Sequence, residues 1–210
     1  MLLHDFDLVV PESQVKDYKQ VVPNANAIVP IPDDVVGLGA VRNWIMDHYE
    51  EEILIMMDDD IKSFVSLLQL KPEKIEDVDV IECILLNCAQ NCIDAGMTLF
   101  SFNQCTTDVR KYRHSQPFNL SSWVGTVVGV VGRKHRFTEV NKLKVDADYA
   151  LKTLLHERVL WIDQRFSFVN IRDRNRGGNT EFRTQQAIED EIKFLEEKWK
   201  KHIRISRHKS

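Results

Sequence analysis

Three consecutive aspartates, Asp58, Asp59 and Asp60, are the residues of this chain best suited to chemistry. They follow Ile53 to Met57, a continuous apolar run of the kind that forms a strand buried on both faces of a sheet. Such a turn brings carboxylates together, and divalent cations such as Mg²⁺ or Mn²⁺ prefer oxygen ligands. We therefore predict a metal site at Asp58 and Asp60, to which a diphosphate would add its own oxygens. The alternative is a solvated acidic turn or the N-cap of a helix.

A second group of candidate residues lies at the start of a predicted helix. Gly37 and Gly39 form a turn, a helix is expected over 40–49, and Arg42 and Asn43 lie near its beginning. Backbone N–H groups at a helix N-terminus and a guanidinium both suit an anionic or ribosyl group, so both residues are candidates for donor binding. The alternative is a structural arginine that pairs with an aspartate of the acidic turn.

A basic, glycine-containing segment at 174–179 precedes the last predicted helix. Arg176, Gly177 and Gly178 in this segment are suited to folding over phosphates as a lid, although an ordinary surface loop would have the same composition. The aromatic side chains that could stack on a sugar or a flipped base are Tyr112, His114, Phe118 and Trp123, and burial in the core explains Trp123 equally well. Weaker candidates for metal binding are the lone His135 and His156.

Short strands and helices that alternate along the chain must position these residues. Strands alternating with helices favour right-handed βαβ crossovers, and hence an α/β fold with a mixed, mainly parallel central sheet flanked by helices. Ligands of such sheets lie at the C-terminal ends of the strands, where the acidic turn falls. The strands are expected at 6–10, 27–29, 53–57, 63–70, 98–102, 123–131, 159–163 and 166–171, the helices at 13–21, 40–49, 73–96, 146–156 and 180–203, and a loop at the active edge at 108–119.

The helix predicted over 73–96 is as long as the charged one that ends the chain. Gly96 provides a C-cap for it. Its amphipathic pattern directs one set of side chains toward the core, namely Ile81, Ile84, Leu85, Cys88, Cys92 and Ile93.

Composition and charge are those of an ordinary globular chain. The 210 residues suffice for one domain with a substantial core, so a single domain is expected over 1–210. Hydrophobic residues at 43% and charged residues at 29% exclude the bias of disordered or coiled-coil chains. The net charge of −4 lacks the strongly basic character of a dedicated nucleic-acid binder, but basic residues gather toward the C-terminus and permit a polyanionic partner.

Cysteine spacing and hydropathy indicate a cytoplasmic protein. The four cysteines do not form the CxxC pairs of zinc sites and are expected to be reduced thiols. The sequence opens without the pattern of a signal peptide, and no apolar run approaches the roughly 20 residues of a membrane span. No membrane partner is therefore expected, and the sequence does not indicate an oligomeric state.

Several short motifs follow one another along most of the chain. They are Val9-Val10-Pro11-Glu12 with Tyr18, the runs at 37–45 and 53–61, and Asp146-Ala147-Asp148-Tyr149 at the start of a helix. In this order they resemble the TET-associated glycosyltransferase family. The resemblance implies a GT-A-like fold, that of the nucleotide-diphospho-sugar transferases. The family is found largely in bacteriophages and is thought to glycosylate oxidised pyrimidines such as hydroxymethylcytosine in DNA.

The resemblance also implies roles for individual residues. Asp58 and Asp60 become a DxD pair that holds Mn²⁺ or Mg²⁺, with Asp60 the best candidate for a direct ligand, and Asp59 helps to position the donor. Asp146 and Asp148 lead the helix at which many GT-A enzymes keep a catalytic carboxylate, and one could act as general base on the acceptor hydroxyl if the enzyme inverts. Asp148 is favoured if only one is catalytic. The alternative is that both complement the helix dipole.

One departure from the GT-A pattern concerns the N-terminus. GT-A folds usually open with a strand and a helix ahead of the stretch that matches 6–12, and these carry part of the nucleoside-binding edge. We expect this first strand to be missing or replaced by a neighbouring one, which would weaken donor binding.

Residues and resemblance together predict a metal-dependent hexosyl- or pentosyltransferase. It would move a sugar from a nucleotide-sugar, with a UDP-sugar as first choice, onto a hydroxymethylated pyrimidine of DNA. The alternatives are the same reaction on a protein or glycan acceptor, a degenerate module that binds without catalysis, and a metal-dependent nuclease or phosphatase. The last alternative uses the acidic turn but leaves the segment around Arg42 and Asn43 unexplained.

Overall fold

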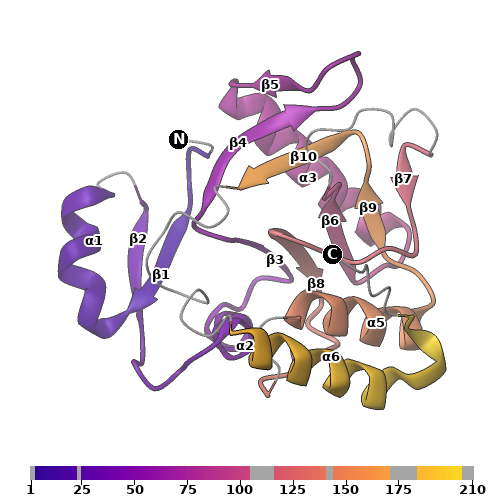
Figure 1. Cartoon of the computed structure of the whole chain (residues 1–210). Coiled ribbons are helices and arrows are strands. Elements are labelled where there is room, and N and C mark those ends of the chain that lie inside the picture. The colour runs from indigo at the N-terminus through magenta and orange to yellow at the C-terminus, as the bar shows by residue number, and fades with distance from the viewer. Residues whose placement is uncertain (1–2, 23–24, 105–115, 141–143, 171–183, 205–210) are drawn as a thin grey trace.

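A mixed five-stranded sheet forms the centre of the molecule. The computed structural model describes residues 3–22, 25–104, 116–140, 144–170 and 184–204. Within these residues, helices pack on both faces of the central sheet (Figure 1). Its strands lie in the order β3 (Ile53–Met57), β8 (Val127–Val131), β6 (Leu99–Phe102), β9 (Trp161–Asp163) and β7 (Phe118–Asn119).

Most neighbouring strands of this sheet run antiparallel. β6 and β9 are parallel, whereas β8 is antiparallel to both β3 and β6, and β7 is antiparallel to β9. The prediction of a mixed sheet flanked by helices is confirmed, but the prediction that it is mainly parallel is wrong. The reason lies in where β8 begins: the pairing of Ser101 with Val128 and of Leu99 with Val130 shows that β8 starts beside the end of β6 and runs back alongside it.

Two smaller sheets flank the central one. The first pairs β1 (Asp7–Pro11) in parallel with β2 (Ala27–Ile31) through the short helix α1 (Val15–Val21) and its preceding 3₁₀ turn η1 (Glu12–Gln14), which confirms the predicted βα unit. The second is antiparallel, in the order β10 (Phe166–Asn170), β4 (Ile61–Ser66) and β5 (Glu73–Ile75).

Helix α3 (Val78–Asp94) covers one face of the central sheet. The predicted helix began at 73, but residues 73–75 form β5, and Asp77 caps α3 by accepting the backbone N–H of Val80 at 3.3 Å. Gly96 ends it in a left-handed conformation at φ +66°, with the Met97 N–H bonded to the Cys92 carbonyl at 2.8 Å, so the predicted C-cap is confirmed. The predicted core face is confirmed for Ile81, Leu85, Cys88 and Cys92, with Ile84 partly buried, but Ile93 is exposed on the last turn.

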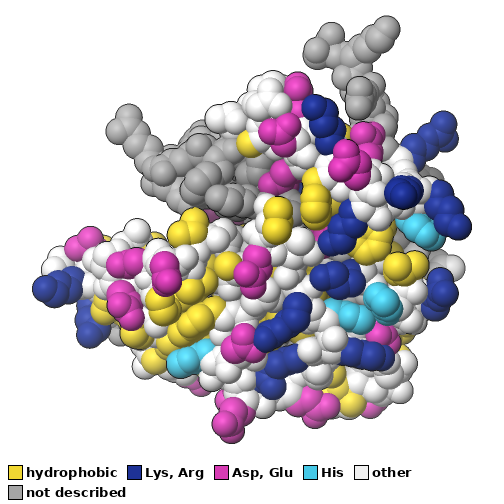
Figure 2. All heavy atoms as spheres, turned by 90° about the horizontal axis from the view of Figure 1, so that it is seen from below, with side chains coloured by type: hydrophobic (Ala, Val, Ile, Leu, Met, Phe, Trp, Pro, Cys, Tyr) yellow, Lys and Arg dark blue, Asp and Glu magenta, His cyan; other side chains and the backbone are white. Residues whose placement is uncertain are grey.

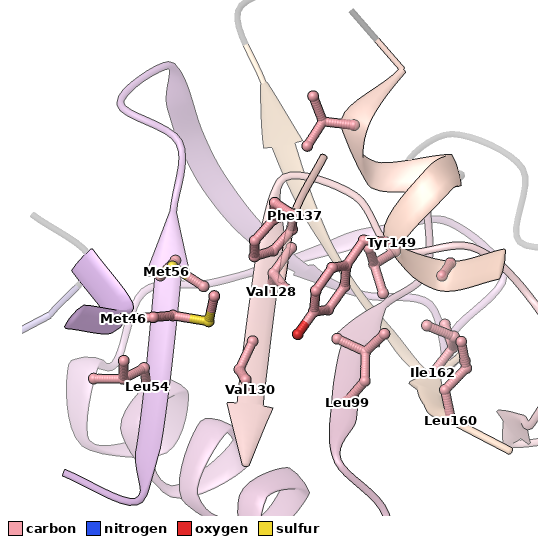
Figure 3. Close-up of a cluster of buried hydrophobic side chains, with 13 residues drawn as sticks. Met46, Leu54, Met56, Leu99, Val128, Val130, Phe137, Tyr149, Leu160 and Ile162 are labelled. Carbon is pink, nitrogen blue, oxygen red and sulfur yellow. The ribbon is translucent and has the colours of Figure 1, made fainter. Parts of the chain in front are cut away.

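Three helices lie on the other side. α2 (Leu38–His48) and α5 (Val145–Glu157) pack on the sheet, and α6 (Gln185–Trp199), followed by the turn η3 (Lys200–His202), lies alongside α5 (Figure 1). Figure 3 shows the core beneath them, in which Tyr149 of α5 and Met46 of α2 pack with side chains from β3, β8, β6 and β9. Successive side chains of β8 point to opposite faces of the sheet. Val128 and Val130 therefore belong to this core, whereas Val127 and Val131 point toward α3.

The surface carries mixed charge. Seen from below, Lys and Arg side chains gather on the side of the molecule that carries α5 and α6, with acidic side chains between them (Figure 2). Basic charge is therefore concentrated there without forming a face of one sign. Among the described residues, no helix combines the length and the apolar composition needed to cross a membrane.

Candidate active site

The N-terminus of α2 packs closely against the loop that precedes α5. Gly37 adopts φ 98°, a conformation that glycine tolerates and side chains disfavour, and so turns the chain into the helix. Gly39 lies so near the loop that a Cβ atom there would be 2.6 Å from the Thr138 carbonyl oxygen. The predicted glycine turn therefore serves two purposes, a backbone conformation and a close approach.

Arg42 joins the acidic turn after β3 to the start of α5. Its side chain is only 2% exposed, and it donates to Asp58 at 3.0 Å and to Asp146. Both carboxylates remain 31% exposed, so each has one side on the guanidinium and one toward solvent. Arg42 was predicted either to bind the donor or to pair with the acidic turn, and the structure shows the pairing. It also pairs with Asp146, which lies 88 positions after Asp58 in the sequence.

The Asp58 carboxyl lies where a negative charge is costly. Burial, together with the nearby charges of Asp146 and Asp60, raises its pKa from 3.8 to about 6, although Arg42 opposes the shift. The turn itself is fixed, because the Asp58 N–H donates to the Thr126 carbonyl at 3.1 Å. Among the described residues, Asp58 and Asp146 thus share the Arg42 guanidinium, and Asp60 lies close enough to Asp58 to raise its pKa.

Asp60 is bonded to Asn170, which in turn contacts Thr126, and the sequence singled out neither residue. The Asn170 Nδ2 donates to Asp60 at 3.0 Å and to the Thr126 hydroxyl at 2.7 Å. Asn170 ends β10, and Thr126 precedes β8, so three segments distant in sequence meet at the acidic turn. No local pattern marks either residue, since only the pairing of β10 with β4 brings Asn170 there.

Asn43 and Asp59, both predicted to bind the donor, have different surroundings. Asn43 is buried and exchanges hydrogen bonds with the backbone of Phe137, at 3.0 Å and 2.9 Å, and its Nδ2 also donates to Glu139 at 2.9 Å. Its amide therefore holds α2 to the loop before α5. Asp59 is exposed at the tip of the turn, between the two other aspartates.

Asp148 is fully buried on the side of α5 that faces α6. Its carboxylate accepts the Thr138 hydroxyl at 2.6 Å and the Trp199 indole N–H at 2.8 Å, and it pairs with Lys198 at 2.7 Å. These bonds tie α5, α6 and the loop at Thr138 together. Asp146, two residues earlier, is the one of the pair whose carboxylate reaches solvent beside the acidic turn.

The other predicted residues do not join this cluster. Phe118 stacks on Trp161 at 4.6 Å, and Trp123 is 62% exposed, so the core does not explain Trp123. His135 and His156 pack ring against ring at 5.3 Å, and His135 lies 3.0 Å from Glu157 at the far end of α5. The predicted residues that lie outside the described ones are Tyr112, His114, Arg176, Gly177 and Gly178, together with most of the loop at 108–119.

The acidic turn suits an open metal site better than a closed one. Proteins commonly hold Mg²⁺ through one or two carboxylates and leave the remaining positions to substrate phosphates and water. Asp58 and Asp60 provide that number on one turn, with Asp58 partly exposed. Within the described part of the chain, no three His, Cys, Asp or Glu side chains are arranged to enclose a metal. The residues present therefore fit a cation that a phosphorylated ligand helps to hold.

Comparison with known protein families identifies the family of this chain. Residues 3–178 match the family described as TET-Associated Glycosyltransferase. The match covers the acidic turn, α2, α5 and every strand from β1 to β10, whereas α6 lies beyond it. No curated protein matches the chain.

Proposed function

Because this chain belongs to the TET-associated glycosyltransferase family, we propose that it transfers a sugar from a nucleotide-sugar, a UDP-sugar as first choice, onto a hydroxymethylated pyrimidine of DNA. The observation that carries the proposal is the acidic turn at 58–60 within the matched residues, at the end of β3, an edge strand of the central sheet. A GT-A-like fold belongs to the proposal, with this turn as its DxD motif. The reaction would take place in the cytoplasm, that of the host if a phage encodes the chain.

The donor site is proposed at the acidic turn and the N-terminus of α2. Asp58 and Asp60 would hold Mn²⁺ or Mg²⁺, which when bound acts as a Lewis acid on the departing diphosphate. Asp59, exposed at the tip of the turn, would contact the donor. The backbone N–H groups at the start of α2 would face its phosphates. Arg42 would keep Asp58 and Asp146 in place, since it neutralises part of the charge they share.

The general base is proposed to be Asp146 rather than Asp148. A base must come within hydrogen-bond distance of the acceptor hydroxyl. The Asp146 carboxylate is partly exposed beside the acidic turn, whereas the Asp148 carboxylate is fully buried against Thr138, Lys198 and Trp199. The preference between the two aspartates that the sequence suggested is therefore reversed in this proposal.

Trp123 supports an acceptor with a flat ring. It is 62% exposed, yet its neighbour Val124 is buried in the core and anchors the loop. The backbone carbonyl of Thr126, three residues after Trp123, accepts the Asp58 N–H. Since three residues span at most about 11 Å, the Trp123 backbone lies near the acidic turn. An exposed indole in that position suits stacking on a base or a sugar.

The first experiment measures donor binding. We expect UDP with Mn²⁺ to raise the melting temperature of the wild type, and Asp60→Ala to abolish the shift, because a ligand stabilises the native state that binds it. Asp94→Ala, which alters an exposed aspartate at the end of α3, is the matched control and should keep the shift. Sugar transfer is then assayed on hydroxymethylated DNA, with unmodified DNA, peptides and glycans as competing acceptors. Transfer to a peptide or glycan alone would contradict the DNA acceptor and leave the transferase intact.

A non-catalytic binding module is the second candidate. It is favoured by Arg42, which already pairs with Asp58 and Asp146 in place of a metal. Absence of any shift with UDP or other nucleoside diphosphates would favour this module. Hydrolysis of phosphate esters without a donor would instead indicate a nuclease or phosphatase.

A further inference from the structure

We infer that Asn170 is a positioning residue of the donor site, which orients Asp60 for the metal and the diphosphate. This inference rests on the proposed function and adds a residue that neither the sequence motifs nor the family match identifies as functional. Its basis is the contact between the Asn170 amide, the Asp60 carboxylate and the Thr126 hydroxyl.

The orientation of the Asn170 side chain follows from its neighbours. A carboxylate only accepts hydrogen bonds when ionised, so the Asn170 group at 3.0 Å from Asp60 Oδ1 must be the NH₂ and not the carbonyl oxygen. The same NH₂ has a second proton for the Thr126 hydroxyl at 2.7 Å. One amide therefore uses both protons to connect the turn to the start of β8.

An irregularity of the β10–β4 ladder places Asn170 there. Val169 pairs with Ser63, but the next residue, Asn170, pairs with Ile61, so Lys62 has no partner in the ladder. Such a bulge twists the strand and redirects the side chain that follows it. Asn170 thereby lies opposite the residue that directly follows Asp60.

The bond to Asn170 differs from the bond to Arg42 in its effect on charge. Arg42 neutralises part of the charge on Asp58, whereas the Asn170 amide is itself uncharged and acts on the Asp60 carboxylate by fixing its direction. A carboxylate held in one direction is a better cation ligand than one that must be ordered when the cation binds. Groups that orient metal ligands in this way typically contribute about 10–100-fold to metal affinity.

The test compares three variants by titrating Mn²⁺ in the presence of saturating UDP. Asn170→Leu removes the amide with little change of shape, Asp60→Ala removes the carboxylate, and Val169→Ala is the matched control on the same strand. Val169 packs on the apolar pair Val65 and Leu67, away from the carboxylates. We expect Asn170→Leu to weaken Mn²⁺ binding about 10–100-fold, and Val169→Ala to leave it unchanged.

Two results would overturn the inference while leaving the proposed function in place. They are wild-type Mn²⁺ affinity in Asn170→Leu when Asp60→Ala has lost it, and an equal loss in Val169→Ala. Absence of Mn²⁺ binding in the wild type with any nucleoside diphosphate would overturn both. Unfolding without metal provides a separate readout, because the variants Asn170→Leu and Asp60→Asn should be non-additive if the two side chains interact.

Discussion

Two aspartates on the same helix turn, Asp146 and Asp148, have opposite surroundings. Asp146 is 31% exposed, and Arg42 holds it beside the acidic turn. Asp148 is fully buried and accepts bonds from Thr138, Lys198 and Trp199. Sequence gives both residues the same description, an acidic side chain in the first turn of α5.

The comparison separates a charge used by the fold from a charge available to a ligand. A buried carboxylate is tolerable only when hydrogen bonds and an opposite charge compensate for lost hydration. Asp148 has both the hydrogen bonds and the opposite charge. Two of its partners, Lys198 and Trp199, belong to α6, so the Asp148 carboxylate helps to hold α6 against α5. Asp146 shares one guanidinium with Asp58 and keeps a side toward solvent. Partial compensation leaves a site to which a cation or a polar acceptor would add stability.

The largest expected effect is on stability, from Asp148→Ala. Loss of this carboxylate leaves the Lys198 ammonium and the Trp199 indole N–H without their shared partner, so we expect a loss of about 3–5 kcal/mol. Denaturant unfolding measures it. Asp146→Ala is the internal control and should lose far less stability, since its carboxylate is partly in water. Equal losses in the two variants would contradict the division of roles.

The next effect comes from Arg42→Met, which keeps the length of the side chain and removes its charge. Asp58 and Asp146 then repel each other with no guanidinium between them, and we expect a loss of about 2–3 kcal/mol, less than for a fully buried pair because both are partly exposed. Adding Asp58→Asn to the variant should recover part of the loss. Thermal unfolding with and without Mn²⁺ should also show a larger stabilisation by Mn²⁺ in Arg42→Met than in the wild type.

A smaller effect concerns the pH dependence of stability. The pKa of Asp58 is raised from 3.8 to about 6 in the folded protein, so the folded state binds a proton more tightly than the unfolded state. Below about pH 4 Asp58 is protonated in both the folded and the unfolded state, so it does not reduce the free energy of unfolding. As the pH rises to about 6, the free energy of unfolding falls by about 1–2 kcal/mol, a value reduced to allow for the partial solvent exposure of Asp58. Above pH 6 the cost is constant.

Asp58→Asn is the comparison for that measurement, because an asparagine can still accept the hydrogen bond from Arg42. The stability of the wild type relative to Asp58→Asn should therefore fall between pH 4 and pH 6. Unfolding free energies of both proteins across this range would show it. A difference that stays constant with pH would argue against the raised pKa.

The smallest effect is expected for Trp199→Phe. This change keeps the aromatic packing of α6 and removes one N–H donor to Asp148, while Thr138 and Lys198 remain, so we expect a loss of about 1 kcal/mol. Trp44→Phe, on a tryptophan that stacks with His48 away from Asp148, is the control for loss of an indole. A loss in Trp199→Phe as large as in Asp148→Ala would mean that the indole, and not the carboxylate, holds α6.

The sequence by itself determined most of the elements and the identity of the acidic turn, but it missed the short strands β5, predicted as helix, and β7, predicted as loop. Hydrophobic periodicity and turn residues are local properties of the sequence. The strand at 53–57, the βα unit at 6–21 and the cap at Gly96 were therefore predictable from neighbouring residues. The order of the motifs was enough to indicate the family. The direction of β8 was not predictable, because it depends on whether the chain crosses over between strands.

Only the tertiary structure decided what surrounds each charged residue. Burial of Asp148 depends on α6, some 50 residues away, and the Arg42–Asp146 pair joins residues 104 positions apart. Asn170 reaches Asp60 through a bulge in the pairing of β10 and β4. Electrostatic roles arise from distance and dielectric environment in three dimensions, and spacing along the chain specifies neither.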